Sequence, residues 1–542
     1  MRNYLNTCLY PLLVFIIGLI FLAWGIGEYP LIDLDEPRYP EAAREMIENS
    51  QYWIPMTNGK LLFEKPILIY WSLILSFKTF GVTEFAARLP SVIAGALTLT
   101  SVFIFGRFFK IGIYASLILA TCVEYFVIAR LSIPELVLNF FTISSILIYF
   151  LISQRLISKN YFYLMSFLMA FGFMAKGPLA VFVPGLVVIS YSLVQHLLKD
   201  ESFQDKFKIV ISNIRLIVFC SILFVIVGGT WFVIAHFMTD GGFTKQFFLT
   251  ENLQRYTSTL TGHKFNWWFY LEVAFIGFLP WSIFLPAYFV RLKSNLSIDP
   301  STYQLKIFSW IWIIANILFF TSSGTKLFNY VFSIFCPMAI LIALWFIEQR
   351  DKREKDIFIS SLVFFIVGLA ILVLSWNGFF TELITKEAFL RTNISPSLVY
   401  VIASAVLMFS ILGIVCAKLK ILKIYFFAVA LIFAAGQLYA VQKVIKPFAE
   451  FKVGGIKRFA EKIPKGIAVY RFKIDRQSLS FYYRGHTKAM GLKKLKIKLL
   501  QKEEFCVLAK KDKLDLFESI SSMKVLSSDD SYVYACANMP EL

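Results

Sequence analysis

Long apolar stretches separated by short polar segments occupy most of this chain of 542 residues. A helix needs about 20 predominantly apolar residues to cross the hydrocarbon core of a bilayer. Runs of that kind recur as far as residue 441. The pattern predicts 13 transmembrane helices, at residues 8–27, 89–106, 111–129, 133–153, 161–175, 178–198, 214–237, 267–290, 307–322, 328–347, 357–376, 397–417 and 421–441. We therefore expect a polytopic α-helical membrane protein.

The composition supports this interpretation and narrows the class of protein. Hydrophobic residues make up 58% of the chain and charged residues only 16%, with a mean hydropathy of +0.68. Soluble domains of ordinary composition carry about 25% charged residues. The composition therefore excludes a secreted mini-protein, a disordered chain and a small soluble enzyme.

The last part of the chain differs from the rest. Residues 445–542 contain no apolar run of spanning length and hold a disproportionate share of the formal net charge of +19. We predict a transmembrane domain at 1–444 and a small soluble domain at 445–542. The basic surface of the second domain suits nucleic acid or, equally, anionic lipid head groups. Its two cysteines, Cys506 and Cys536, are either disulfide-bonded or two unlinked thiols.

Lysine and arginine gather in the loops on one side of the predicted membrane domain. The positive-inside rule places this side in the cytoplasm. The opposite side receives the acidic segment 33–48, two long loops at 28–88 and 238–266 and, because the number of crossings is odd, the C-terminal domain. Loops of this length usually have a function. Within the first loop, the pattern of residues 40–50 predicts an amphipathic interfacial helix.

The densest polar cluster follows the first predicted span and contains Asp35, Arg38 and Tyr39. A carboxylate here can coordinate or deprotonate a substrate, and a guanidinium can bind an anion. The alternative is a solvated helix terminus. Further along the loop come Glu64 and Lys65. Lys65 either meets a phosphate as a point charge or forms a surface ion pair.

Three more charged residues, Glu135, Lys176 and Lys326, lie at the outer ends of apolar segments. Ionisable groups at such depths are costly and usually line a pathway or a pocket. The alternative for either lysine is snorkelling to the membrane interface. Glu251 and Arg255 add an acid and a base to the second outer loop, where a plain polar helix face is the alternative.

Carboxylates, an arginine, lysines and tyrosines on one outer face suit a phosphate-bearing, lipid-linked substrate. His263 has no second histidine nearby, which disfavours a metal site. The chain contains no glycine-rich phosphate-binding loop, which argues against direct use of ATP.

The first 345 residues contain a series of specific sequence blocks. In chain order these are Leu34-Asp35-Glu36-Pro37-Arg38-Tyr39-Pro40-Glu41, Arg44-Glu45-Met46, Trp53-Ile54-Pro55, Phe63-Glu64-Lys65-Pro66, Tyr70-Trp71, Ala175-Lys176-Gly177, Glu251 to Tyr256, Leu279-Pro280-Trp281 and Lys326 to Tyr330. The blocks resemble the lipid A aminoarabinose transferases, a branch of the polyprenyl-phosphate-sugar-dependent GT-C glycosyltransferases related to protein O-mannosyltransferases. The resemblance implies a GT-C fold of about 13 transmembrane helices followed by a periplasmic α/β domain.

The resemblance also implies roles for individual residues. Asp35 looks like the essential first-loop aspartate of the family, and Glu135 falls where the family has a second acidic residue, commonly Asp. Lys65 looks like the lysine that holds the phosphate of the donor, with Arg255 and Tyr330 lining the same cavity. We therefore expect catalytic roles for Asp35 and Glu135. The other residues expected to bind substrate are Arg38, Tyr39, Glu64, Lys176 and Lys326.

Two positions depart from the family pattern. Leu62 replaces a tyrosine that often contributes a phosphate contact. Glu64 resembles a metal ligand of one family type, but Thr250 stands where its histidine partner would be. We therefore predict no metal in the site and no required cofactor.

The function implied by the resemblance is inverting sugar transfer from undecaprenyl phosphate to a phosphate of lipid A, on the periplasmic face of a bacterial inner membrane. The sugar would be aminoarabinose-like, another amino sugar or a hexose. The implied partners are the lipid-linked donor, lipid A or another anionic glycolipid, and the membrane, with no nucleic acid. The alternatives are a protein O-mannosyltransferase-like or other glycan-modifying enzyme that uses the same class of donor, and a flippase for lipid-linked sugars.

Overall fold

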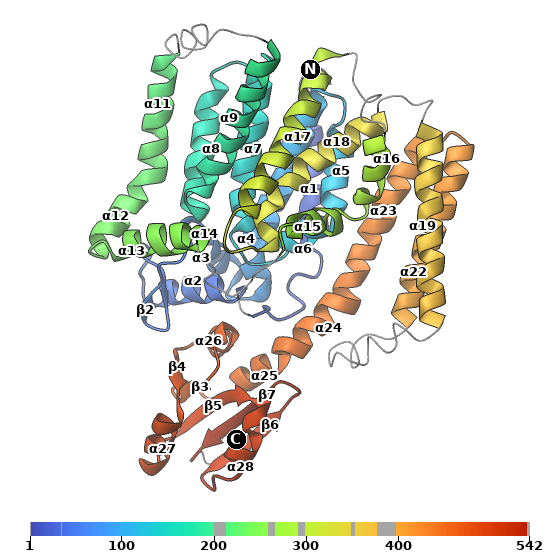
Figure 1. The fold of residues 1–542 in the computed structure, drawn as a ribbon. Coiled ribbons are helices and arrows are strands. Elements are labelled where there is room, and N and C mark those ends of the chain that lie inside the picture. Colours follow the sequence, from blue (N-terminus) through green and yellow to red (C-terminus); the bar gives the residue numbers. More distant parts are fainter. Residues whose placement is uncertain are drawn as a thin grey trace.

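The structure, a computed structural model, describes residues 2–33, 35–199, 213–257, 266–290, 299–347, 353–376 and 397–538. A bundle of long helices forms one end of the molecule (Figure 1). A layer of loops and short helices covers one end of this bundle, and the C-terminal domain lies beyond that layer.

Most of the bundle consists of apolar helices. Its elements are α1 (Arg2–Ala23), α4 (Glu84–Arg107), α5 (Gly112–Thr121), α6 (Val123–Ala129), α7 (Glu135–Ser153), α8 (Tyr161–Lys176), α9 (Leu179–Lys199), α11 (Ile214–Phe224), η1 (Val225–Gly229), α12 (Thr230–Met238), α15 (Phe269–Gly277), η3 (Trp281–Phe284), α16 (Leu285–Val290), α17 (Pro300–Thr321), η4 (Phe328–Ile334), α18 (Phe335–Ile347), α19 (Arg353–Trp376), α22 (Ser397–Lys418) and α23 (Leu422–Ala440). Among the described residues, eight helices are long and apolar enough to cross a membrane, or nine if the bent pair α5 and α6 forms one span. Several shorter apolar helices accompany them. The count of 13 spans stays a prediction.

The predicted span at residues 267–290 is not a continuous helix. It is divided into α15, the short 3-10 helix η3 and α16. Pro280 lies at the break. A proline has no backbone N–H and its ring clashes with the carbonyl of the preceding turn, so α15 ends at Gly277. The apolar run alone therefore predicts a longer helix than the structure contains.

The first outer loop folds into α2 (Arg38–Glu48), the two-stranded sheet β1 (Met56–Thr57) and β2 (Lys60–Leu61), and α3 (Leu68–Phe80). The helix predicted at residues 40–50 is present as α2, but most of its polar stripe is buried inside the protein. Glu41 and Arg44 are buried, and the Arg44 guanidinium donates to both carboxylate oxygens of Glu41, each at 2.7 Å. The helix is covered by α3 and by the C-terminal domain, so its charged residues pair in the interior.

The C-terminal domain is built on a mixed five-stranded sheet in the order β4-β3-β5-β7-β6. Strand β3 runs parallel to β4 and β5, whereas β7 runs antiparallel to β5 and β6. Cys506 and Cys536 face each other in the β5–β7 register and form a disulfide. The elements are η6 (Val441–Ile445), α24 (Lys446–Ala449), η7 (Glu450–Gly454), α25 (Gly455–Lys462), β3 (Ala468–Phe472), α26 (Gln477–Tyr483), β4 (Thr487–Met490), α27 (Leu492–Leu500), β5 (Phe505–Lys510), η8 (Lys511–Lys513), α28 (Leu514–Glu518), β6 (Met523–Ser528) and β7 (Tyr532–Ala537).

One continuous helical segment of 41 residues, Leu422–Lys462, joins the bundle to this domain. At 1.5 Å per residue it is about 60 Å long. It contains α23, two π-helical segments (η6 and η7), α24 and α25. The expected boundary between residues 444 and 445 falls inside this segment, which crosses from one domain into the other (Figure 1).

The C-terminal domain is attached to the first outer loop by specific polar contacts. The Asp33 carboxylate accepts hydrogen bonds from the backbone N–H of Ser478, at 3.1 Å, and from its hydroxyl. The Asn58 side-chain oxygen accepts one from the Thr487 backbone N–H at 2.7 Å. These contacts hold the domain beside the end of the bundle where the polar blocks of the sequence converge.

Candidate active site

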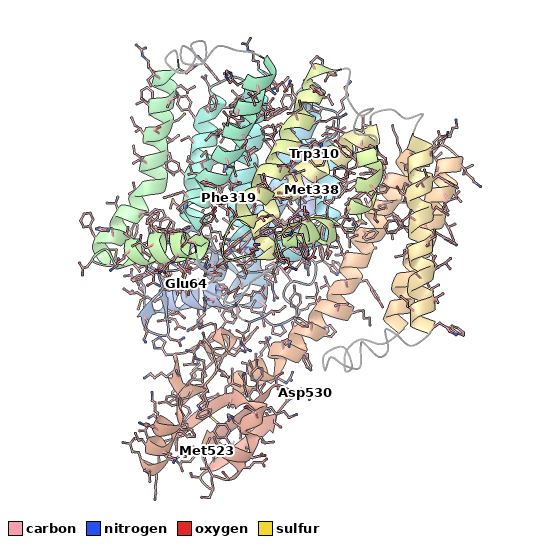
Figure 2. All side chains as sticks on the ribbon, viewed as in Figure 1. Glu64, Trp310, Phe319, Met338, Met523 and Asp530 are labelled. Carbon is pink, nitrogen blue, oxygen red and sulfur yellow. A yellow bond between two sulfur atoms is a disulfide. The ribbon has the colours of Figure 1, made fainter. Side chains whose placement is uncertain are left out.

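A cavity of about 790 Å³ lies between the bundle, the first outer loop and the C-terminal domain. Figure 2 labels Glu64, one of its lining residues, at the end of the bundle that faces the C-terminal domain. Nine of the ten residues expected to form the site line this cavity: Asp35, Arg38, Tyr39, Glu64, Lys65, Glu135, Lys176, Arg255 and Tyr330.

Glu135 and Lys176 meet because two antiparallel neighbouring helices begin and end at the same level. Glu135 opens α7, where a negative charge is favoured by the helix dipole, and Lys176 closes α8, where a positive charge is favoured. The Glu135 Oε1 accepts hydrogen bonds from Lys176 Nζ at 2.6 Å and from Asn329 Nδ2 at 2.8 Å. Its Oε2 is buried and accepts none from the described residues. Glu135 is therefore held in place with one oxygen left for a ligand.

The residue after Lys176 brings the second outer loop against this pair. Gly177 has φ +82°, a left-handed conformation that ends α8, and a Cβ at this position would lie 2.5 Å from the Phe247 ring. Phe247 belongs to the π-helical segment η2 (Gln246–Gln254), which follows α13 (Gly242–Lys245) and precedes α14 (Arg255–Thr257). The close approach places Glu251 and Arg255 at the cavity, where their side chains form an ion pair at 3.1 Å.

Arg38 and Glu64 form an ion pair from two parts of the first loop, in which one guanidinium nitrogen donates to both carboxylate oxygens. The Arg38 Nη1 lies 3.0 Å and 2.8 Å from the two carboxylate oxygens of Glu64. The carboxylate that would resemble a metal ligand is thus occupied by a guanidinium, and Thr250 supplies no imidazole. Among the described residues no three His, Cys, Asp or Glu side chains converge as a metal site, and His263 lies outside those residues. The absence of a metal from the site stays a prediction.

Lys65 is placed to bind an anion in the cavity. Its side chain is only 8% exposed, and its Nζ donates to the backbone carbonyl of Glu64 at 3.1 Å. Within the described ranges it forms no ion pair with a carboxylate. Burial, followed by the nearby charges of Lys176 and Arg255, lowers the pKa of Lys65 to about 8. A phosphate beside Lys65 would relieve both effects.

Asp35 and Glu36 are neighbours in sequence but lie in different environments. Glu36 is 2% exposed, and both of its oxygens accept hydrogen bonds from Arg88, at 2.7 and 3.0 Å. Asp35 is exposed at the cavity, and its carboxylate makes no hydrogen bond to the described part of the chain. Glu36 therefore anchors the turn that presents Asp35.

Two tyrosines complete the wall. Tyr39 is buried in α2 and packs edge-on against Tyr70, with ring centroids 6.2 Å apart. Burial, reinforced by the carboxylates of Glu135 and Glu64, raises the pKa of Tyr39, so its phenol stays protonated and able to donate. Tyr330 lies on η4 with its ring centroid 5.9 Å from Lys176 Nζ.

Some residues of the site were not expected, and one expected residue is absent from it. Lys326 does not line the cavity, and its Nζ donates to the backbone carbonyl of Asn266 at 3.3 Å. The wall instead gains Asn329, which holds Glu135, and Phe448 and Asp475 from the C-terminal part of the chain. No local sequence pattern identifies Phe448 and Asp475 as residues of the site. They reach the cavity because the long α23–α25 segment brings the C-terminal part of the chain to it.

Comparisons with known proteins give a consistent picture. A model for the family described as dolichyl-phosphate-mannose-protein mannosyltransferase matches residues 64–224. An undecaprenyl phosphate-alpha-4-amino-4-deoxy-L-arabinose arabinosyl transferase from Aeromonas hydrophila is 27% identical over 66% of this chain, and the match covers 63% of that relative. A protein of the same name from Yersinia enterocolitica is 27% identical over 68% of this chain and 66% of its own length.

Solved structures with the same fold extend the likeness to almost the whole chain. ArnT from Cupriavidus metallidurans, in a crystal structure bound to undecaprenyl phosphate, superposes with a TM-score of 0.75 at 18% identity, covering 97% of this chain and 98% of that one. Its apo structure gives a TM-score of 0.74. These matches confirm the resemblance found in the sequence blocks: this chain is a multi-pass membrane protein of the GT-C fold, and it is similar in sequence to the lipid A aminoarabinose transferases.

Proposed function

We propose that this protein is an inverting glycosyltransferase that moves an aminoarabinose-like sugar from undecaprenyl phosphate to a phosphate of lipid A, on the periplasmic face of a bacterial inner membrane. The observation that carries the proposal is the single cavity in which Lys65, Arg255, Asp35 and Glu135 converge. The names of the curated relatives support the donor and the sugar, although the first of them is matched over only 63% of its length.

The reaction breaks the bond between the anomeric carbon and the phosphate oxygen of undecaprenyl phosphate. An oxygen of the acceptor phosphate attacks the anomeric carbon from the opposite side, and the electron pair of the broken bond stays on the leaving phosphate. The leaving group therefore gains one negative charge. Lys65 has no carboxylate partner within the described ranges and is placed to stabilise that charge. Arg255 and Lys176 add positive potential from the adjoining wall.

The acceptor needs positioning more than deprotonation, because a phosphate monoester is already anionic at neutral pH. Asp35 and the unpaired oxygen of Glu135 supply hydrogen-bond acceptors on two walls of the cavity. They are placed to orient the hydroxyl and ammonium groups of the sugar. With a neutral hydroxyl as acceptor, Asp35 would have to act instead as a general base.

Transfer in a purified system tests the proposal. The full-length protein in detergent is incubated with undecaprenyl-phosphate aminoarabinose and lipid A, and the lipid is analysed by mass spectrometry. Lipid A with its phosphates removed is the matched control acceptor. We expect the sugar on phosphorylated lipid A and none on the control.

Other outcomes would select another function. Sugar on both acceptors would place the bond at a hydroxyl and overturn the phosphate acceptor. Transfer to added membrane protein instead of lipid A would favour a protein glycosyltransferase, the activity described for the family model that matches residues 64–224. Movement of the donor across proteoliposome membranes without any transfer would favour a flippase.

A further inference from the structure

A second cavity, of about 620 Å³, opens at the other end of the bundle. It lies where the start of α5, the end of α18, the start of α19 and the turn between α22 and α23 meet. In Figure 1 this turn is at the end of the bundle farthest from the C-terminal domain. The charged residues that line the cavity in the described part of the chain are Lys110, Glu354, Lys420 and Lys423.

This cavity is remote from the candidate active site. Helix α4 begins at Glu84, which pairs with Lys457 of the C-terminal domain, and ends at Arg107, three residues before Lys110. Its 24 residues span about 36 Å at 1.5 Å per residue. The two cavities have no described lining residue in common. Under the positive-inside rule, the second cavity faces the cytoplasm.

The floor of the cavity is formed by packed aromatic rings. The Tyr114 and Phe346 rings both pack against Phe426, with centroid distances of 4.7 and 5.0 Å, and Phe426 itself is fully buried. Ile424, also in the lining, is well exposed on the outside of the bundle. The cavity thus continues onto an apolar surface of the kind that contacts lipid chains.

The rim of the cavity carries more positive than negative charge. Among the described lining residues three lysines face one glutamate, and the Lys420 Nζ lies 3.8 Å from Glu354 with its own side chain 75% exposed. An exposed pair at that distance is weak. Lysines around an apolar cavity at the cytoplasmic end of transmembrane helices are typical of sites for anionic lipid head groups.

Two of the lysines occupy equivalent positions in two helix-ending turns of the same type. Lys110 and Lys420 have φ of 60° and 61°, and the next residue in each case donates to a carbonyl five residues back, Ile111 to Gly106 and Ile421 to Cys416. Glycine is the usual residue at such a position because a side chain is disfavoured there. Both helices nevertheless place a lysine there, directly at the mouth of the cavity.

We propose that this cavity binds the phosphodiester head group of an anionic glycerophospholipid from the cytoplasmic leaflet. The lysines contact the phosphate, and the glycerol and the first part of the acyl chains lie over the aromatic floor towards Ile424. Neither the donor nor the acceptor of the sugar-transfer reaction is involved, so the site is separate from the proposed activity.

Native mass spectrometry of the full-length protein in detergent tests this site with phosphatidylglycerol, phosphatidylcholine and inorganic phosphate as probes. The test variant carries Lys110→Gln and Lys423→Gln. The control variant carries Arg155→Gln and Lys159→Gln, on the same face of the protein but outside the cavity. Arg155 has φ 56° and the same helix-ending turn, with Leu156 donating to Leu151, so the control reproduces the backbone context of Lys110.

We expect wild-type protein to retain phosphatidylglycerol and to release phosphatidylcholine. Retention should fall about tenfold in the test variant and by less than twofold in the control. Equal loss in both variants, or equal retention of both lipids, would overturn the proposal. Displacement of the lipid by inorganic phosphate would show a site for free phosphate and would also overturn it.

A photoreactive phosphatidylglycerol, labelled in its head group, gives a second measurement on the wild-type protein that does not depend on the folding of any variant. Cross-links should map to peptides that contain residues 110–114 and 420–426. Labelling spread evenly over all the loops of that face would contradict a built site.

Discussion

The first outer loop contains two sets of charged residues that differ in how their polar atoms are bonded. We call Glu36 and its partner Arg88, with the Glu41–Arg44 pair, the anchoring region, and Asp35 and Lys65 the cavity region. In the anchoring region, Glu36 and Arg88 are almost completely buried, and Arg88 also donates to the backbone carbonyls of Ile26 and Tyr29. In the cavity region, Asp35 has no hydrogen-bond partner among the described residues and Lys65 has only a backbone carbonyl. The difference lies in how completely the polar atoms are satisfied inside the protein.

This contrast explains how a loop can be both rigid and reactive. A buried ion pair is costly to form but very costly to break on one side, so it fixes the backbone around it. The anchoring region uses this property to hold the loop, including the buried Glu41–Arg44 pair of α2. The cavity region holds the side chains of Asp35 and Lys65 in a defined place without an ion-pair partner among the described residues. A bound ligand can supply that partner.

The largest expected effect is that of Asp35→Asn on activity. The substitution keeps the size of the side chain and removes its charge, so sugar transfer should fall by about 10² to 10⁴, the usual range for a positioned acid or base. Because Asp35 makes no hydrogen bond to the described chain, the thermal unfolding midpoint should not change. Initial rates and a thermal melt on the same preparation check both parts. A lowered melting temperature would place Asp35 in the anchoring region instead.

Glu36→Gln should give the opposite result. It leaves Arg88 buried without a counter-charge, which costs about 3–5 kcal/mol. The four hydrogen bonds that the carboxylate accepts, from Arg88, from Ile32 N–H and from Ser132 N–H, are also disturbed. We expect a low yield of folded protein and a strongly reduced melting temperature. Normal stability combined with lost transfer would contradict the division of the loop into two regions.

Lys65→Met tests the other residue of the cavity region. Removing one preorganised charge from a leaving group usually costs about 10² to 10³ in rate. The loss should appear in kcat/KM for the lipid-linked donor, while the KM for lipid A stays unchanged. Lys60→Met is the matched control, since Lys60 is exposed on β2 of the same loop and lines neither cavity. A similar loss in both variants would remove the specific role of Lys65.

The sequence predicted the cavity better than it predicted the elements around it. Asp35, Lys65, Glu135 and Arg255 follow from ordered blocks and from the cost of placing charge near a membrane. The same reasoning included Lys326 because it also ends an apolar segment. The direction of its side chain, towards the Asn266 carbonyl, depends on the packing of two loops that no local pattern encodes.

Features that depend on contacts between distant segments cannot be predicted from local sequence patterns. The polar stripe of α2 indicates a solvated face, yet the C-terminal domain covers it, more than 400 residues later in the chain. The apolar run at 267–290 predicts one span, but Pro280 divides it. Asn329 had no signal of its own beyond its place between Lys326 and Tyr330, and its contact with Glu135 spans 194 residues.

The smallest expected effect is a pH dependence that belongs to Lys65 alone. The cationic form of this lysine binds the donor phosphate, and its pKa of about 8 lies well below that of an ordinary lysine. The charge is therefore present below pH 8 and is lost as the pH rises above it. Donor kcat/KM, which reports ionisations of the free enzyme, should be level at pH 7 and fall about tenfold per unit above pH 8. In Lys65→Arg the side chain stays charged throughout, so the fall near pH 8 should disappear even if the overall rate is lower. A fall of the same size at the same pH in the arginine variant would assign the ionisation to another group and leave Lys65 without its distinguishing property.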